Sequence, residues 1–404
     1  MYTSTRGQRA PQLMDPQGDQ GMKVIAQEES AQRTSFGAAS FAKPTSTYRV
    51  SSPSPGGPTD MAATAVQQQA SPTRARSTTM QAIVRDRYGS PDVLELREIN
   101  KPAPRDDEVL VRIRATSANP RDRHLLRGLP RLPVRLAGYG LRTPKHRVLG
   151  GDLAGQVEAV GKTVRRFRPG DEVFADIETG CFAEYTCVSE NLLQLKPANL
   201  TFEQAAAVPL AGVTALQGLR DAGHVRPEQK VLIIGASGGV GTFAVQIAKW
   251  FGAEVTGVCS TRNVELVRSI GADHVIDYTQ QDFTESGQKY DLILQLAGTR
   301  SPSDCRRALN RNGTLVLSSG DSAGRWVGPV DRILKAIALS PFVSQRLSPL
   351  VAKPNNGDLL LLKELIEVGQ LTPVIDRTYS LSEVPDAVRY LEAGHARGKV
   401  VITV

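Results

Sequence analysis

The sequence predicts an α/β protein in which a doubly wound parallel sheet follows a separate β-rich region. Residues 231–234 are apolar and lead into a glycine-rich turn, and residues 242–250 then carry apolar side chains at helical spacing. Strand-like and helix-like segments alternate from there to residue 318, which is typical of a parallel sheet covered by helices. Residues 80–199 instead contain short alternating runs separated by Gly and Pro turns, which indicates strands.

The glycine-rich turn has the composition of a phosphate-binding loop. Gly235, Gly238 and Gly241 are spaced G-x-x-G-x-x-G, and Ala236 replaces the first glycine of the usual dinucleotide fingerprint. Glycines are needed because a phosphate approaches the main chain more closely than a Cβ permits. The strand, turn and helix together present backbone N–H groups and a positive helix end to a pyrophosphate. A plain glycine-rich helix start is the alternative. The expected cofactor contacts here are Ser237, Gly238, Gly239 and Val240.

The segments after the turn predict the rest of the parallel sheet. Strands are expected at 254–260, within 271–278, at 290–296 and at 313–318, with helices at 263–270 and 304–309. The carboxyl ends of such strands form the ligand crevice of a doubly wound sheet. Ser319, directly after the last strand, is included among the expected cofactor contacts.

The second of these strands indicates which nicotinamide cofactor is used. An NAD site usually carries Asp or Glu about 20 residues beyond the glycines, where it accepts the ribose hydroxyls. Residues 259–262 are instead Cys-Ser-Thr-Arg, without a carboxylate. A hydroxyl at Ser260 and a guanidinium at Arg262 suit a 2′-phosphate, since Arg can bind phosphate in a two-pronged fashion. Arg262 could instead be an ordinary solvated residue at a helix start. The sequence favours NADPH over NADH.

Composition and charge exclude several classes of protein. The chain has 404 residues, enough for two or three domains. Its net charge of +8 comes from scattered Lys and Arg, without the basic stripe interleaved with aromatics that marks nucleic-acid binding. No apolar run reaches the length of a membrane span, and Pro209 interrupts the longest one, 205–216. The four cysteines show no CxxC pairing, which favours free, buried thiols in a reducing cytoplasm.

Residues 1–79 differ from the rest of the chain and are expected to be a disordered tail. They are rich in Ser, Thr, Gln, Pro and Gly and lack hydrophobic periodicity, so they cannot bury enough apolar surface to offset the entropy of ordering. Their acidic residues argue against a mitochondrial transit peptide, and there is no apolar signal core. The tail is either dispensable or an upstream extension of a chain whose natural start is Met80.

Several different motifs follow one another along residues 80–404, and together they resemble those of a known family. They are 80–84 (MQAIV), 117–122 (SANPRD), 150–155 (GGDLAG), 167–173 (FRPGDEV), 180–185 (GCFAEY), 206–215 (AAVPLAGVTA), the glycine turn, 271–278 (GADHVIDY) and 398–402 (GKVVI). In this order they resemble the medium-chain dehydrogenase/reductase superfamily, specifically its zinc-independent quinone oxidoreductase branch, which includes zeta-crystallin. The resemblance implies a GroES-like β-barrel domain, split by an inserted Rossmann domain, with the active site in the cleft between them.

The resemblance implies a division of the chain into four parts. These are the tail, 1–79; the first part of the GroES-like catalytic domain, 80–203; the Rossmann NADP-binding domain, 204–343; and the second part of the catalytic domain, 344–404. Strands are expected at 109–115, 153–160, 171–174, 182–188 and 399–403, with helices at 358–368 and 384–391.

Zinc decides the branch of the family. Zinc-dependent relatives place a Cys ligand near Asn119, a His-Glu pair at Gly151-Asp152, and a four-cysteine structural loop in the barrel domain. The present chain has Asn and Gly-Asp at the first two places and no cysteine cluster. A zinc site needs about three or four converging N, S or O ligands. No metal ion is therefore expected.

Without zinc, the resemblance implies hydride transfer from the nicotinamide to the β-carbon of an enone or quinone, with a hydrogen-bond donor at the developing enolate oxygen. His124 falls where several relatives carry a Tyr near the nicotinamide, and an imidazole can donate a proton near neutral pH. A packing or surface histidine is the alternative. Asn119 is expected to orient the nicotinamide ribose or the substrate, or else to be a turn residue before Pro120. Asp152 is expected to be structural rather than catalytic.

Two further cofactor contacts and one apolar segment complete the expectations. Thr214 is expected to start the long helix that approaches the cofactor, and Tyr278 to flank the adenosine side. The apolar segment 321–350, which includes Trp326 and Phe342, is expected to pack between the domains. It could also line the substrate mouth, pack in a homodimer, or lie at a membrane surface.

The predicted function is zinc-independent, NADPH-dependent reduction of a quinone, an enone or a related carbonyl compound. Two alternatives stay open: a cofactor-binding protein of low activity with a structural or regulatory role, and an alcohol dehydrogenase of the zinc class. Turnover with a simple enone or quinone would distinguish the predicted reductase from a cofactor-binding protein of low activity. Metal analysis would distinguish it from a zinc-class alcohol dehydrogenase. The sequence does not identify the substrate, because the pocket is lined by loops whose side chains belong to no motif.

Deletion of residues 1–79 is expected to leave folding and turnover nearly unchanged, because nothing in the tail can join a packed core. Thermal unfolding and steady-state turnover of the truncated and full-length chains check this expectation. A large drop in melting temperature on truncation would show that the tail contributes to the folded structure.

Overall fold

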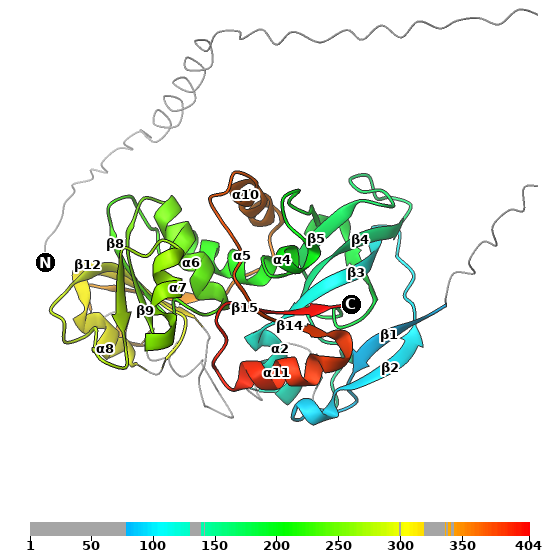
Figure 1. The fold of residues 1–404 in the computed structure, drawn as a ribbon, viewed down its shortest axis with the longest axis horizontal. Helices are drawn as coiled ribbons and strands as arrows, with labels where there is room; N and C mark the ends of the chain where they lie inside the picture. Colours follow the sequence, from blue (N-terminus) through cyan, green and yellow to red (C-terminus); the bar gives the residue numbers. More distant parts are fainter. Residues whose placement is uncertain are drawn as a thin grey trace, which may run out of the picture. The chain divides into compact units, whose positions relative to one another are not determined.

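The computed structural model describes residues 78–129, 139–140, 142–298, 300–318, 336, 338–340 and 343–404. Ser319, the expected tail up to residue 77 and most of the apolar segment 321–350 lie outside the described residues. Within those residues the chain forms a parallel sheet, a mixed sheet and a two-stranded hairpin, joined by helices (Figure 1).

A six-stranded parallel sheet is built from the middle of the chain. In spatial order its strands are β10 (His274–Asp277), β9 (Glu254–Cys259), β8 (Lys230–Ile234), β11 (Tyr290–Gln295), β12 (Leu309–Ser318) and β13 (Arg346–Leu350). Every neighbouring pair is parallel. The strand order reverses between β8 and β11, which is where a doubly wound sheet binds its ligand. The predicted doubly wound parallel sheet is confirmed.

The sixth strand, β13, is not predicted from the sequence. It pairs with β12 from Thr314↔Arg346 to Ser318↔Leu350. Its polar residues and Pro349 interrupt the apolar run that marks the inner strands, and proline is tolerated because β13 is an edge strand. The parallel sheet therefore continues beyond residue 343, where the sequence placed the end of the Rossmann domain.

The helices of this region are α6 (Gly239–Trp250), α7 (Val264–Ser269) and α8 (Pro302–Arg307). Phe243 and Ile247 of α6 are buried, as their spacing predicts. Trp250 is the exception, because it ends the helix and its side chain is 40% exposed against the ring of Phe251. Helical spacing therefore predicts the buried face of α6 only as far as the helix lies over the sheet.

A seven-stranded sheet combines the N-terminal and C-terminal parts of the chain. Its order is β14 (Ile375–Ser380), β15 (Lys399–Thr403), β3 (Glu108–Ala118), β4 (Asp152–Val160), β5 (Glu172–Asp176) and β7 (Gln194–Leu195), with β6 (Tyr185–Ser189) also paired to β3. The C-terminal strand β15 lies antiparallel to β3, with Val400 opposite Ala118. The two segments therefore form one sheet, as expected for a split barrel domain (Figure 1).

The remaining elements surround this sheet. They are the antiparallel hairpin β1 (Thr79–Val84) and β2 (Glu95–Asn100), with helices α2 (Pro120–Arg127), α4 (Phe202–Ala206), α5 (Pro209–Gln217), α10 (Asn356–Glu367) and α11 (Val384–Glu392). Isolated bridges join the hairpin to the rest of the domain, from Ala82 to Ala183 and from Val84 to Val148.

Helix α5 connects the two sheets through a shared apolar core. One buried cluster contains four residues of α5 together with Ile233 of β8, Phe174 of β5 and Val401 of β15. Pro209 occupies the first turn of α5, where its missing N–H removes no helical hydrogen bond. Since both sheets bury side chains against the same helix, the position of α5 is set by the two domains together.

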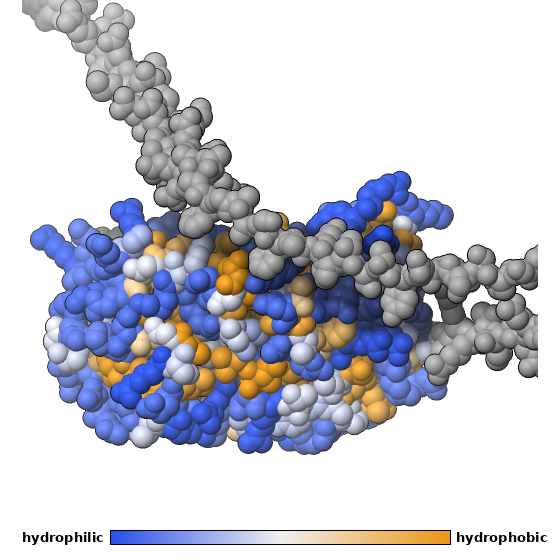
Figure 2. Space-filling model, turned by 45° about the horizontal axis from the view of Figure 1, so that its top comes forward, coloured by the Kyte–Doolittle hydropathy of each residue, from blue (hydrophilic) through white to orange (hydrophobic). Residues whose placement is uncertain are grey.

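The surface in Figure 2 is mostly hydrophilic, with apolar residues gathered in a band across the face that is drawn. Cys181, Cys259 and Cys305 are buried and Cys187 is half-buried, and all are free thiols, as the sequence predicts. Burial raises the pKa of Cys187 and of Cys259 to about 11. Among the described residues no helix is both long and apolar enough to span a membrane.

Gly241→Ala is expected to lower the free energy of unfolding by about 1–3 kcal/mol, because an added Cβ would lie 2.1 Å from the backbone oxygen of Gly235, which cannot move aside. Gly357→Ala is the matched control, since Gly357 also lies in the first turn of a long helix and its added Cβ meets only the Asn355 side chain, at 3.2 Å. Urea unfolding of both variants measures the difference. Equal midpoints would show that the turn tolerates a Cβ at residue 241.

Candidate cofactor and catalytic site

The glycine turn leaves β8 and begins α6 with the geometry that a phosphate-binding loop requires. Gly235 has φ +88°, a conformation that favours glycine. Ala236, which stands at the first glycine of the usual fingerprint, is fully buried. It packs against Gly257 of β9, where an added Cβ would lie only 3.0 Å from the Ala236 Cβ. Gly235 supplies the positive φ of this turn, and the small side chain of Ala236 fits beside Gly257.

The four expected contacts in this turn lie at the start of α6. Gly238 is the N-cap residue, and a Cβ there would meet only the Gly235 oxygen, at 3.4 Å, so its outer side is open. Gly239 lies against Lys399, whose Cδ would be 3.0 Å from an added Cβ. Ser237 is buried, while Val240 is half-buried and packs on the shared core. The turn thus combines open main chain with unpaired N–H groups at a helix start.

The expected 2′-phosphate residues follow β9, the strand next to the glycine turn. Ser260 is half-buried at the carboxyl end of β9, and Arg262 is exposed two residues later. Arg262 Nη2 donates to the backbone oxygen of His395 at 2.7 Å, which anchors the guanidinium and leaves its other N–H groups for a ligand. Asn263 is buried and donates through Nδ2 to Ser237 Oγ at 3.0 Å and to Ser260 Oγ at 3.2 Å.

The other expected cofactor contacts are Tyr278, Thr214 and Ser319, and their contact with a cofactor stays a prediction. Tyr278 follows β10 and is 63% exposed at the same edge of the sheet, and its N–H donates to the Cys259 oxygen at 3.0 Å. Thr214 does not start a helix, because α5 begins at Pro209. Its hydroxyl donates to the Leu210 oxygen at 2.6 Å, one turn back along the helix. Ser319 lies outside the described residues.

A buried ion pair lies beside the turn. Lys399 Nζ, on β15, donates to Asp152 Oδ2 at 3.1 Å and to Asn119 Oδ1 at 2.5 Å. The Lys399 side chain is 3% exposed and that of Asp152 is fully buried. An isolated bridge pairs Gly398 with Gly238, so β15 brings Lys399 directly to the glycine turn. This network is the point where the barrel domain meets the parallel sheet.

Asp152 is the centre of the network. Its Oδ2 accepts hydrogen bonds from Ser117 Oγ at 2.5 Å and from Asn119 Nδ2 at 3.0 Å as well as from Lys399. Its Oδ1 accepts the backbone N–H of Leu210 at 2.8 Å, in the first turn of α5. The N-cap residue of α5 makes no side-chain hydrogen bond, so a carboxylate from the barrel domain satisfies this helix end. The geometry supports the structural role expected for Asp152.

Asn119 is the N-cap residue of α2 and is 2% exposed. Its Nδ2 donates to Asp152 and to the Ser117 oxygen, and its Oδ1 accepts from Lys399. Both amide N–H groups are therefore committed within the protein, and one acceptor position on Oδ1 stays open. The sequence predicts that Asn119 orients the nicotinamide ribose or the substrate, and this role stays a prediction; in the structure its side chain is held by Ser117, Asp152 and Lys399.

The role of Lys399 is not predicted from the sequence. The motif GKVVI predicts a terminal strand, and a lysine at the start of a strand is usually a solvated residue. The signal that could have found it is the position of one charged residue directly before three buried apolar residues, Val400 to Ile402. Its partners are far apart in the sequence, so no local pattern could identify them.

A second buried polar cluster supports the start of α2. Asp122 accepts the N–H of Asn119 at 2.8 Å and that of Gly150 at 3.2 Å, and burial raises its pKa to about 6. Arg121 Nη2 donates to Asp176 Oδ1 at 2.6 Å and to the Ile177 oxygen at 2.7 Å. Burial also raises the pKa of Asp176 to about 6. These contacts join the residues just before β4 and the C-terminal end of β5 to helix α2, whose N-cap residue is Asn119.

His124 lies in the last turn of α2 and is half-buried, whereas Asn119 lies at the opposite end of the helix. The N–H groups of Gly128 and Leu129 both donate to the His124 backbone oxygen, which closes the helix at Gly128. The buried network thus contains one of the two expected catalytic residues, Asn119. A proton-donating role for His124 stays a prediction.

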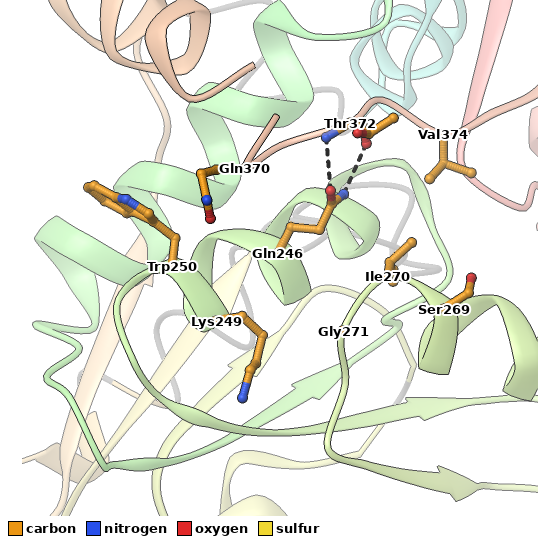
Figure 3. Close-up of a pocket in the computed structure, with 9 residues that line it drawn as sticks. All are labelled: Gln246, Lys249, Trp250, Ser269, Ile270, Gly271, Gln370, Thr372 and Val374. Atoms are coloured by element: carbon orange, nitrogen blue, oxygen red, sulfur yellow. Dashed lines mark hydrogen bonds between the residues drawn. The ribbon is translucent and has the colours of Figure 1, made fainter. Parts of the chain in front are cut away.

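A surface pocket lies away from the glycine turn, near the end of α6. Its volume is about 550 Å³, and it is lined by Gln246, Lys249, Trp250, Ser269, Ile270, Gly271, Gln370, Thr372 and Val374 (Figure 3). The Gln246 amide donates to the Thr372 oxygen and accepts the Thr372 N–H. Lys249 is paired with Asp273 at 2.8 Å. None of the expected cofactor contacts lines this pocket.

Several proteins that resemble this chain are named as oxidoreductases. A family model described as the alcohol dehydrogenase GroES-like domain matches residues 105–198, and one described as zinc-binding dehydrogenase matches residues 270–402. The chain is 35% identical over 384 residues to NAD(P)H oxidoreductase RTN4IP1, mitochondrial, of Mus musculus, covering 83% of this chain and 91% of that protein. It is 36% identical over 341 residues to NADPH-dependent alkenal/one oxidoreductase, chloroplastic, of Arabidopsis thaliana, covering 80% and 79%. These relatives are named as mitochondrial and chloroplastic proteins. The cytoplasmic location expected from the sequence of this chain stays a prediction.

A solved structure shows the same fold. The quinone oxidoreductase from Coxiella burnetii superimposes with a TM-score of 0.69 at 31% sequence identity, covering 81% of this chain and 99% of that one. The split barrel domain, the doubly wound sheet and the glycine turn agree with these matches. The chain belongs to the medium-chain dehydrogenase/reductase superfamily, in its quinone oxidoreductase-like branch, and is an NAD(P)H-dependent oxidoreductase.

Proposed function

We propose that this protein uses NADPH, without a metal ion, to reduce a quinone or the conjugated double bond of an enone. The observation that carries the proposal is the network of Lys399, Asp152 and Asn119 beside the glycine turn. The relatives named as alkenal/one and quinone oxidoreductases support the substrate class.

The residues at the carboxyl edge of the parallel sheet fit a phosphate-bearing nicotinamide cofactor. The main chain at Gly238 is open to a pyrophosphate at the start of α6. The hydroxyls of Ser237 and Ser260 accept from Asn263 and donate to no other described residue, so each keeps a proton for an anionic oxygen. Arg262 supplies a guanidinium beside Ser260. When bound, the cofactor supplies the hydride.

Lys399 holds the catalytic side of this site in place. Two of its N–H groups are bonded to Asn119 and Asp152, and the third has no acceptor among the described residues. Because Lys399 lies against Gly239, its charge adds to the positive end of α6 where an anion binds. Asn119 is held with a single orientation, so its open Oδ1 position is available to a donor from ribose or substrate. His124 is proposed as a proton donor to the substrate.

The network does not fit a zinc ion. The places at which zinc-dependent relatives carry ligands hold Asn119 and Asp152, and both side chains are already bonded to an ammonium. In the described part of the chain no three His, Cys, Asp or Glu residues come together as a metal site would require. The buried cation at this position is Lys399, and the charge of Asp152 is balanced without a metal.

The purified protein is expected to oxidise NADPH with a simple enone or quinone, to contain no stoichiometric zinc, and to keep its activity in the presence of a chelator. A panel of quinones, enones and aldehydes, followed by absorbance of NADPH, with metal analysis of the same sample, measures all three. Zinc near one per chain that is lost together with activity would contradict the metal-free proposal. Absence of turnover with every compound would favour a cofactor-binding protein.

Arg262→Ala is expected to weaken NADPH binding and to leave NADH binding almost unchanged, because only NADPH has a 2′-phosphate to lose. A hydrogen bond to a charged group contributes about 1.5–3 kcal/mol. The dissociation constant for NADPH should therefore rise roughly 10- to 100-fold. Arg262→Lys is the matched control, since it keeps the charge but not the two-pronged geometry. Titration with NADPH and with NADH measures the two dissociation constants. An equal rise in both would contradict the role of Arg262 at the 2′-phosphate.

A further inference from the structure

We propose that Asn263 is a positioning residue that turns the hydroxyl protons of Ser237 and Ser260 toward the phosphate groups of the cofactor. The proposal rests on the proposed use of a phosphate-bearing nicotinamide cofactor and names a residue that fixes two of its contacts at once. Asn263 itself touches no ligand in this role.

Asn263 bridges two loops that follow neighbouring strands. Ser237 belongs to the glycine turn after β8, and Ser260 follows β9. Asn263 ends the short 3₁₀ helix η5 (Thr261–Asn263) and is 5% exposed. Its single amide nitrogen lies 3.0 Å from Ser237 Oγ and 3.2 Å from Ser260 Oγ. The part of the site expected to face the pyrophosphate is thereby tied to the part expected to face the 2′-phosphate.

The direction of these hydrogen bonds determines what the serines can do. An amide nitrogen can only donate, so each serine oxygen is an acceptor toward Asn263. Each serine then has one proton left, and neither hydroxyl donates to another group among the described residues. A phosphate oxygen only accepts, so a hydroxyl held in this way is already arranged to donate to it. The amide therefore prepares both donors before the ligand arrives.

The other end of the amide shows that the N–H groups are the reason for the residue. Asn263 Oδ1 is buried and has no hydrogen-bond partner within the described residues. Leaving a buried acceptor unpaired is unfavourable, and native proteins contain few such groups. An apolar side chain of similar size would avoid this cost. Keeping an amide here is explained if its two donated hydrogen bonds serve the site.

The proposal predicts how binding changes when the amide is altered. Asn263→Asp keeps the shape but replaces the donors with acceptors, so the serine protons turn inward and the phosphates lose them. Asn263→Ala removes the donors and the unpaired oxygen together. Both variants should raise the dissociation constant for NADPH about tenfold or more. The rise for NADH should be smaller, because NADH lacks the group opposite Ser260.

Cofactor titration of the full chain, followed by quenching of protein fluorescence, provides the test. Asn199→Asp is the matched control for an added charge, since the Asn199 amide donates to the Ile366 oxygen at 2.8 Å, outside the proposed site. A double-mutant cycle combines Asn263→Ala with Ser260→Ala. If the amide acts through the hydroxyl, the second change should add little to the first. The melting temperature without cofactor reports on folding, and KM for NADPH should rise while kcat changes little.

Each outcome bears on a different statement. A wild-type chain that binds neither NADPH nor NADH would overturn the proposed function itself. A wild-type chain that binds NADPH, with Asn263 variants that bind it equally well, would overturn only the role of Asn263. Fully additive effects of Asn263→Ala and Ser260→Ala on the free energy of NADPH binding would also overturn only the role of Asn263. So would loss of the melting transition in Asn263→Ala, because it would show that the amide serves folding instead.

Discussion

The buried ion pair between Lys399 and Asp152 is the interaction on which the arrangement of this molecule depends. The carboxylate of Asp152 accepts four hydrogen bonds, from β3, from the start of α2, from β15 and from the first turn of α5. Removing two charges from water is costly, and such a pair is tolerated only when further hydrogen bonds satisfy both partners. Here three of those hydrogen bonds come from the seven-stranded sheet and the helix that follows β3, and the fourth comes from α5, the helix whose core is shared with the parallel sheet. The pair therefore joins the seven-stranded sheet to the helix that packs against both sheets.

The same pair shapes the chemistry of the site. The ammonium of Lys399 is bonded to Asn119 and Asp152, which stand in the sequence where the family resemblance places ligand positions of the zinc-dependent members. The methylene carbons of Lys399 also lie against Gly239, at the helix start that is proposed to receive an anion. In the proposed function the polarising cation belongs to the chain, and the reducing power comes entirely from the nicotinamide. Asn119 then acts as an oriented acceptor with one open position, because its two donors are committed.

The nucleotide side of the site shows a similar use of buried polar groups. The buried amide of Asn263 donates to Ser237 and to Ser260, and in its proposed role it prepares both hydroxyls to donate to the cofactor. Hydrogen bonds among buried groups are fixed in direction, so the cofactor does not have to reorganise them on binding. Both halves of the site thus rely on residues one layer behind the ligand, and the exposed Arg262 and Tyr278 are added at its rim.

The sequence by itself determined the local parts of this protein: the glycine turn, the alternating strands and helices, and the expected residues at the carboxyl edge of β9. Each depends on spacing within a short segment, where backbone geometry and periodicity act. The split barrel was expected only from the family resemblance, because its two parts are far apart in the sequence. Tertiary structure alone decided the pairing of Lys399 with Asp152, the support that Asp152 gives to α5, the internal position of Thr214, the edge strand β13 and the bridge at Asn263. These depend on groups from distant segments, and the identity of a polar residue does not reveal its partner until folding brings the two together.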